Sequence, residues 1–139
     1  MSDLKSFKRL LPTIGRWVFG VPLILFGLMD LFHPMASPPG MPALAKQFSE
    51  ALAASGYMMP LIGIVLLGSG ILLVSNRFVP LALLLLAPFW VNSLLFHIFL
   101  ERTGLPFAAV FVAIELALAW AYRGTFAAVL KAKNTPEPG

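Results

Sequence analysis

The chain has 139 residues, of which 59% are hydrophobic and only 12% are charged, whereas about a quarter of the residues in a soluble domain are charged. Because a water-soluble fold of this size cannot hide so much apolar surface, the composition excludes a soluble enzyme and predicts one membrane domain. The formal charge of +4 is better explained by membrane orientation than by nucleic-acid binding.

Four apolar stretches predict an all-α integral membrane fold, an antiparallel bundle of four transmembrane helices. The predicted spans cover residues 12–34, 57–75, 78–100 and 105–123. Each is close to the roughly 20 residues that a helix needs to cross a bilayer. Backbone groups find no water in lipid, so helices are the natural structure for such long apolar runs.

The first span follows Lys5, Lys8 and Arg9, as the apolar part of a signal peptide would. Its apolar part is too long for a signal peptide, however, and it carries Asp30 and His33 near its end. We therefore expect this span to be retained as a membrane anchor.

The segment between the first two spans predicts a short amphipathic helix at the outer surface, over residues 42–55. Leu44, Phe48 and Leu52 follow one another at four-residue intervals, and Gly56 ends the pattern. The later connections are short, which makes the spans they join antiparallel neighbours. The Pro-rich tail 134–139 is expected to be disordered.

Basic residues predict the orientation. With four crossings, eight of the ten fall on one side of the membrane, namely Lys5, Lys8, Arg9, Arg16, Arg77, Arg123, Lys131 and Lys133. Only Lys46 and Arg102 fall on the other side. The positive-inside rule then places both termini in the cytoplasm.

Small residues recur on single faces of three predicted spans. In the first span they alternate with charges along one stripe, formed by Arg16, Gly20, Leu23, Gly27 and Asp30. Such a stripe predicts an inward-facing seam, because charges avoid lipid and glycines allow close helix contact. In the second span, Gly56, Gly63 and Gly70 predict a packing seam, and in the fourth Ala109, Ala113, Ala117 and Ala121 predict contact with a neighbour or another protomer.

Two ionisable residues in the inner half of the bilayer predict an ion pair. Arg16 lies a few residues into the first span and Glu115 lies near the middle of the fourth. An unpaired charge at that depth costs about 2.5–3.5 kcal/mol on insertion scales, so pairing is favourable. The alternative is that Arg16 extends to the cytoplasmic interface and Glu115 is protonated.

Asp30, His33, Asn92 and His97 are candidates for a site in the outer half. We expect Asp30, Asn92 and His97 to line an outward-opening pocket in which Asp30 or His97 exchanges a proton. The alternative for the histidines is interfacial hydrogen bonding. No His-x-x-x-His spacing is present, so we expect no metal site and no haem, and the lack of cysteine excludes thiolate ligands.

Several short segments resemble the DoxX and DoxX-like family of small four-helix bacterial membrane proteins. They are Gly15-Arg16-Trp17-Val18-Phe19-Gly20, Phe26-Gly27-Leu28, Leu67-Gly68-Ser69-Gly70-Ile71-Leu72-Leu73, Leu86-Ala87-Pro88-Phe89 and Asn92-Ser93-Leu94-Leu95-Phe96-His97. The resemblance covers about residues 12 to 130. It implies association with quinone-linked or oxidative-stress membrane complexes. The absence of cysteine argues against a sulfur relay through a thiol of this chain.

The leading hypothesis is a quinone-associated subunit of a membrane oxidoreductase, with a quinone as cofactor and other membrane subunits as partners. Catalytic roles are expected for Asp30 and His97, and cofactor-binding roles for Asn92, His33, Arg16 and Glu115. The alternatives are a non-catalytic membrane scaffold that docks other helices, and a transporter of small solutes or protons. A transporter built from four helices would need to form a homo-oligomer.

Overall fold

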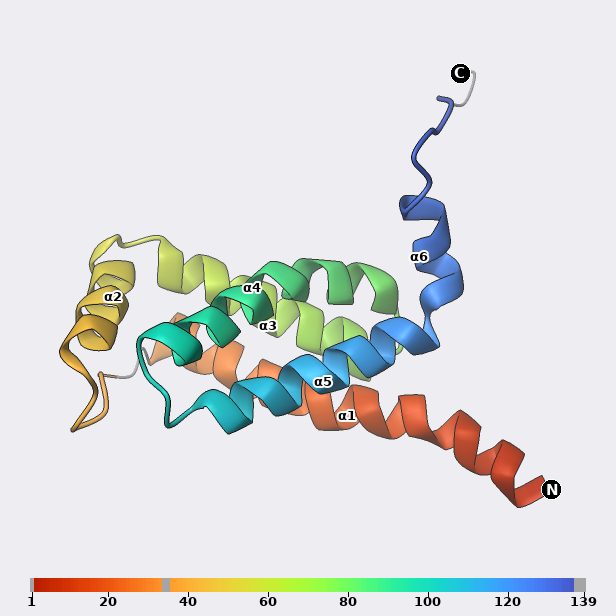
Figure 1. The fold of residues 1–139 in the computed structure, drawn as a ribbon, viewed down its shortest axis with the longest axis horizontal. Coiled ribbons are helices and arrows are strands. Elements are labelled where there is room, and N and C mark those ends of the chain that lie inside the picture. The colour runs from red at the N-terminus through yellow and green to blue at the C-terminus, as the bar shows by residue number, and fades with distance from the viewer. Residues whose placement is uncertain (1, 34–35, 137–139) are drawn as a thin grey trace.

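The computed structural model describes residues 2–33 and 36–136, and all regular secondary structure in this part of the chain is helical. The elements are α1 (Ser2–Phe32), α2 (Ala43–Ala54), α3 (Met58–Val74), α4 (Val79–Phe99), α5 (Leu105–Ala121) and α6 (Arg123–Val129). Helices α1, α3, α4 and α5 run side by side (Figure 1). We call the end that carries α2 the α2 end, and the opposite end, where both chain termini lie, the terminal end.

The lengths of the four helices that run side by side fit a membrane bundle. Leu4–Phe32 and Val79–Phe99 are each long and apolar enough to cross a bilayer alone. Helices α3 and α5 have 17 residues each. They give the third and fourth candidate spans when α3 is counted together with α2 and α5 together with α6; the bend between α2 and α3 is 88°, and that between α5 and α6 is 83°. About 17 residues is the lower limit for a spanning helix. The predicted four-span bundle is therefore confirmed as the fold.

The two ends of the chain differ from the sequence prediction. Helix α1 begins at Ser2, about ten residues before the predicted span, because the polar segment ahead of the apolar run continues the helix. Helix α6 was not expected, since its seven residues follow the fourth span without a Gly-rich or Pro-rich break. Residues 134–136 have no regular secondary structure, and the rest of the tail lies outside the described residues.

Helices α1 and α3 cross at a seam built from glycines of both. A Cβ atom at Gly27 would lie 2.5 Å from the backbone nitrogen of Leu67, and one at Gly70 would lie 2.8 Å from the carbonyl oxygen of Gly20. Gly63 faces the backbone of Gly27 in the same way. The predicted glycine seams are thus confirmed at these four positions, and they face each other.

Gly56 does not belong to this seam. It follows the end of α2 with a φ of +75°, and nothing lies within 4 Å of the position its Cβ would take. A left-handed residue that ends a helix is a common role of glycine. The predicted seven-residue series in α3 therefore has two members, not three.

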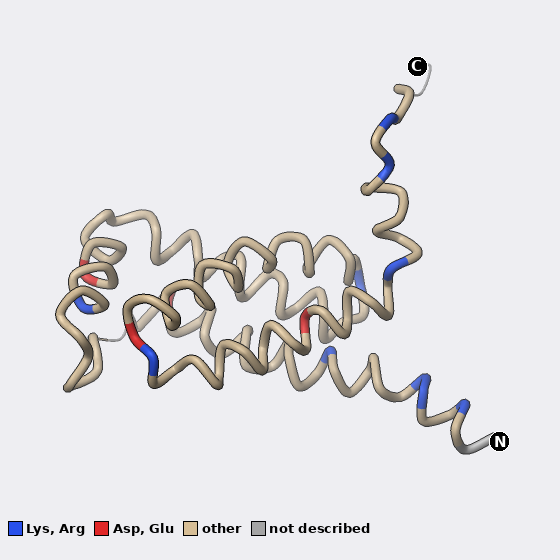
Figure 2. Tube along the Cα trace, in the orientation of Figure 1, with Lys and Arg blue, Asp and Glu red and all other residues tan. Residues whose placement is uncertain are grey.

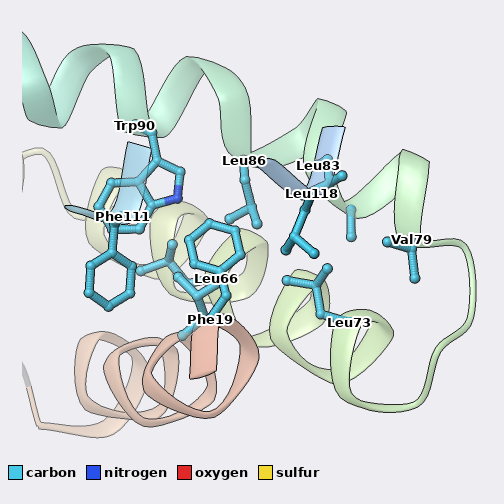
Figure 3. Close-up of a cluster of buried hydrophobic side chains, with 11 residues drawn as sticks. Phe19, Leu66, Leu73, Val79, Leu83, Leu86, Trp90, Phe111 and Leu118 are labelled. Atoms are coloured by element: carbon cyan, nitrogen blue, oxygen red, sulfur yellow. The ribbon is translucent and has the colours of Figure 1, made fainter. Parts of the chain in front are cut away.

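The centre of the bundle is an aromatic cluster contributed by three helices (Figure 3). Phe19 of α1 is fully buried, and its ring centroid lies 5.8 Å from that of Trp90 on α4 and 5.7 Å from that of Phe111 on α5. Trp90 and Phe111 stack at 4.9 Å. Buried aliphatic side chains extend the cluster, namely Leu23, Leu66, Leu73, Val79, Ala82, Leu83, Leu86 and Leu118.

Two helix faces that the sequence analysis singled out are largely exposed in the single chain. The alanine ridge of α5, formed by Ala109, Ala113, Ala117 and Ala121, points away from the other helices, because α5 buries Ala108, Phe111, Glu115 and Leu118 instead. In α2 the buried residue is Ala45, whereas Leu44 of the predicted apolar stripe is 66% exposed. Phe48 of that stripe still packs on Phe96 of α4 at 5.7 Å.

Charged residues gather at the two ends of the bundle (Figure 2). At the α2 end, Lys46 and Glu50 form an exposed pair at 3.7 Å along α2. At the terminal end, basic residues predominate along the start of α1, at the start of α6 and in the segment that follows α6. Two exposed aromatic side chains lie at helix ends, as expected at membrane interfaces: Trp120 near the end of α5 and Tyr57 directly before α3. The exposed Trp17 lies in the middle of α1.

Candidate functional site

An apolar pocket opens between α4, α5 and α6 and contains a single ionisable side chain. The pocket has a volume of about 330 Å³. Trp90 of α4 and Glu115 of α5 line it, and Phe126 of α6 contributes one wall. Its rim includes the exposed side chains of Val91 and Leu116, so it opens toward the position of lipid. We call it the Glu115 pocket.

Glu115 lies in this pocket with an unusual lack of partners. The residue is 7% exposed, and its Oε1 atom is buried without a hydrogen-bond partner among the described residues. The indole nitrogen of Trp90 is also buried without a partner there. Buried polar atoms are rarely left unpaired in folded proteins, and such exceptions often mark functional groups. Both unpartnered atoms thus belong to side chains that line the pocket.

The predicted ion pair between Arg16 and Glu115 is wrong. Among the described residues, the ionisable pairs within 4.0 Å are Lys46 with Glu50 and His97 with Glu101. Arg16 instead donates from Nη1 to the Tyr122 hydroxyl at 2.9 Å, and from Nη2 to the Thr13 hydroxyl at 3.5 Å. Both Arg16 and Glu115 are buried, as predicted, but in different surroundings.

The direction of helical side chains explains why the pair does not form. Side chains in a helix lean toward its N-terminus. The N-terminus of α1 lies at the terminal end and that of α5 at the α2 end. Arg16 therefore leans toward the terminal end and Glu115 away from it, although the two residues occupy similar levels.

The predicted outer pocket is not assembled from Asp30, Asn92 and His97. Asn92 is exposed because it lies about 200° around α4 from the buried Trp90. Asp30 is half-buried on α1 and its Cβ lies 3.2 Å from the position a Cβ of Gly63 would take. His33 is exposed at the end of α1. The groove at the α2 end is lined by residues 38–42 and 99–103, and by none of the predicted four.

His97 belongs to a compact capping structure between α4 and α5. Its Nδ1 atom lies 3.1 Å from Glu101 Oε2 and 2.9 Å from the Glu101 carbonyl oxygen. The other oxygen of the Glu101 carboxylate accepts from the backbone nitrogen of Thr103 at 2.7 Å and from the Thr103 hydroxyl. Gly104 donates its backbone N–H to Oε2 at 3.0 Å, and its lack of a Cβ makes room for the imidazole of His97.

The sequence did not point to Glu101, although a signal for it exists. A carboxylate four residues before the first residue of a helix, with Thr and Gly between, can accept the backbone N–H groups that precede the helix. Glu101, Thr103 and Gly104 stand in this order before α5. The contacts of His97 therefore indicate a structural role in this cap.

Replacing the charge of Glu101 is expected to remove a pH-dependent contribution to stability. Hydrogen bonds from the Thr103 side chain, and then from the Gly104 and Thr103 backbone and His97, lower the pKa of Glu101 from 4.5 to about 2 against the opposing effect of burial. A carboxylate with a depressed pKa stabilises the fold above pH 4.5, and this contribution is lost as the pH falls toward 2.

The measurement is thermal unfolding of the wild type and of Glu101→Gln in the same detergent over this pH range. The wild type is expected to melt at the higher temperature at neutral pH, and the difference is expected to shrink below pH 4.5. A difference that stays constant down to pH 2 would show that the Glu101 charge does not stabilise the connection. Glu50→Gln on the exposed face of α2 is the control.

Groups of three or more His, Cys, Asp or Glu with metal-site geometry are absent from residues 2–33 and 36–136. Comparison with protein families gives one match, in which the DoxX family model covers residues 11–98. This segment is more than half of the chain and runs from the start of the first apolar stretch to the end of α4. Neither the curated proteins nor the solved structures gave a match.

Proposed function

Because the chain belongs to the DoxX family, we propose that it is a quinone-associated subunit of a membrane oxidoreductase or oxidative-stress system, with the quinone ring in the Glu115 pocket. The observation that supports this most is an unpartnered carboxyl oxygen in an otherwise apolar pocket. The pocket volume of about 330 Å³ is in the range of small-molecule sites. A bacterial inner-membrane location with cytoplasmic termini belongs to the same proposal.

The residues of the pocket fit the two ends of such a ligand. The Glu115 carboxyl group is the polar group in the lining that lies nearest to the ring oxygens, and the Trp90 ring offers a flat surface. The exposed rim residues Val91 and Leu116 give an isoprenoid tail a route into lipid. A bound quinone would supply two-electron chemistry coupled to proton uptake or release.

Glu115 is the residue of this chain that would exchange a proton with the quinone ring oxygens. Its carboxyl group accepts or donates a hydrogen bond at a ring oxygen according to its own protonation. The neighbouring Phe126 wall and the apolar lining exclude water from the carboxyl group. The proton-exchange role that the sequence suggested for Asp30 and His97 moves in this proposal to Glu115, because those two residues lie outside the pocket.

Removing the Glu115 carboxyl group is expected to weaken quinone binding and to stabilise the protein. One hydrogen bond lost corresponds to roughly a tenfold loss of affinity at about 1.4 kcal/mol. Glu115→Leu also removes a buried polar atom without a partner, which is expected to raise stability by about 1–3 kcal/mol. The measurements are the affinity for a short-chain ubiquinone or menaquinone analogue, read from Trp90 fluorescence, and the melting temperature. Trp17→Phe and Trp120→Phe leave Trp90 as the sole tryptophan, which is excited selectively at wavelengths where tyrosine does not absorb.

Asp30→Asn and His97→Ala are the matched controls, since they change polar groups outside the pocket. They are expected to bind the analogue as the wild type does. Equal affinity of Glu115→Leu and wild type would remove the quinone from this pocket. Loss of binding in Asp30→Asn or His97→Ala alone would place the ligand at the α2 end instead.

The exposed alanine ridge of α5 favours a second candidate, a scaffold that docks a helix of another membrane protein. Ala109, Ala113 and Ala117 present small side chains on the outer surface, and small residues allow close approach of a partner helix in lipid. A scaffold needs no ligand in the Glu115 pocket. Gently purified protein whose lipid extract holds no quinone, but which retains a stoichiometric protein partner, would favour this candidate.

A further inference from the structure

Arg16 is a buried charge that the proposed quinone site does not use. The residue is 8% exposed, and both of its hydrogen-bond partners, Tyr122 and Thr13, are neutral hydroxyl groups. The Nε atom is buried and has no partner among the described residues. A guanidinium group carries five N–H donors, so most of its donors and its full positive charge lack an acceptor of opposite charge.

The contacts of Arg16 place its guanidinium group at the membrane interface. Tyr122 directly follows α5, and its hydroxyl donates to Oδ1 of Asn76 at 3.4 Å in the turn between α3 and α4. Both residues stand where spans end, at the terminal end of the bundle. The chain of contacts from Arg16 through Tyr122 to Asn76 therefore joins three helical spans at the level where lipid headgroups begin.

The surroundings of Arg16 are strongly basic. Lys5 and Arg9 are exposed and lie on the same stripe of α1 as Arg16, at intervals of four and seven residues. Arg77 is exposed in the neighbouring turn. Of the acidic side chains that the structure describes, Asp30, Glu50 and Glu101 lie toward the α2 end, and Glu115 lies in its own pocket.

Helix dipoles offset only part of this charge. The C-termini of α3 and α5 both lie at the terminal end, and each adds about half a negative charge near Arg16. Partial charges do not supply an acceptor for Nε, which stays unpaired. The missing group must be anionic, must accept several hydrogen bonds in one plane, and must be available at headgroup level.

We propose that Arg16, supported by Tyr122 and Asn76, binds the phosphate group of an anionic phospholipid at the terminal end of the bundle. Guanidinium groups bind phosphate oxygens through two parallel hydrogen bonds. The exposed Lys5 and Arg9 along α1 add the long-range attraction that favours anionic over zwitterionic lipids. The site is separate from the Glu115 pocket and stands whether or not a quinone binds there.

The test is native mass spectrometry of the full chain released from nanodiscs that contain equal amounts of phosphatidylglycerol and phosphatidylcholine. The wild type is expected to retain one phosphatidylglycerol preferentially. Arg16→Gln is expected to retain about tenfold less, because it loses hydrogen bonds made by a charged group. Arg16→Lys keeps the positive charge but replaces the planar guanidinium group by a compact ammonium group. It is expected to retain severalfold less phosphatidylglycerol than the wild type.

Arg77→Gln is the matched control, since it removes the same charge from an exposed position at the same end. It is expected to retain the lipid nearly as well as the wild type. Retention by Arg16→Lys and Arg16→Gln at the wild-type level, or an equal loss in Arg77→Gln, would overturn the proposal. Thermal protection by inorganic phosphate in pure phosphatidylcholine nanodiscs, equal to that by phosphatidylglycerol, would assign the site to a soluble phosphate and overturn the lipid assignment.

Discussion

Gly27→Ala is expected to force α1 and α3 apart and to destabilise the bundle strongly. The added Cβ would lie 2.5 Å from the Leu67 nitrogen and 2.8 Å from the Gly63 carbonyl oxygen. Both are backbone atoms of α3, so no side chain can rotate to make room. Overpacking costs about 1–3 kcal/mol and sometimes more, and we expect the upper part of this range.

The measurement is thermal unfolding in detergent, compared with Gly68→Ala on α3, the helix that Gly27 contacts. Nothing lies within 4 Å of a Cβ at Gly68, so that variant is expected to be neutral or more stable by up to about 1 kcal/mol through helix propensity. Equal melting temperatures for Gly27→Ala and Gly68→Ala would mean that α1 and α3 do not cross as closely as described.

Phe19→Ala is expected to be the most destabilising core substitution. Phe19 is fully buried and contacts the rings of Trp90 and Phe111 on two other helices, so truncation leaves a cavity at the meeting point of α1, α4 and α5. In soluble proteins Phe→Ala costs about 3–5 kcal/mol. We expect the lower part of that range, because lipid removes most of the hydrophobic transfer contribution but not the packing loss.

Phe99→Ala is the control for Phe19→Ala. Phe99 is 76% exposed near the end of α4, so its removal deletes contacts with lipid and leaves no internal cavity. The Phe19 variant should melt well below both the wild type and the Phe99 variant. Similar melting temperatures for the two variants would mean that the aromatic cluster is not the packed centre of the bundle.

The sequence predicted the fold well because the patterns that specify the fold repeat along the chain. Long apolar runs give the spans, and glycines at seven-residue intervals, such as Gly20 with Gly27 and Gly63 with Gly70, identify the faces that meet. These signals depend only on helical periodicity. Helix α6 was missed because a seven-residue helix after a span carries too short a pattern to separate from the span itself.

The site was predicted less well because it depends on direction as well as position. Arg16 and Glu115 were correctly expected to be buried, but their pairing requires side chains to point toward each other, and their antiparallel helices direct them apart. Asn92 was expected to line the same pocket as His97, although Asn92 lies outside the buried face of α4. Glu101 accepts hydrogen bonds from the backbone of Thr103 and Gly104 in the loop between α4 and α5. A local capping pattern of this kind does not show in the hydrophobic periodicity of the sequence.

The unequal lengths of the helices have a consequence for the surrounding membrane. Helices α3 and α5 have 17 residues each and are about 25 Å long, a few ångströms less than a typical hydrocarbon core of about 30 Å. The 21-residue α4 fully matches that thickness. Lipids beside α3 and α5 must therefore compress while those beside α4 need not, so the protein is expected to prefer thin bilayers and to sit in an asymmetric annulus of deformed lipid.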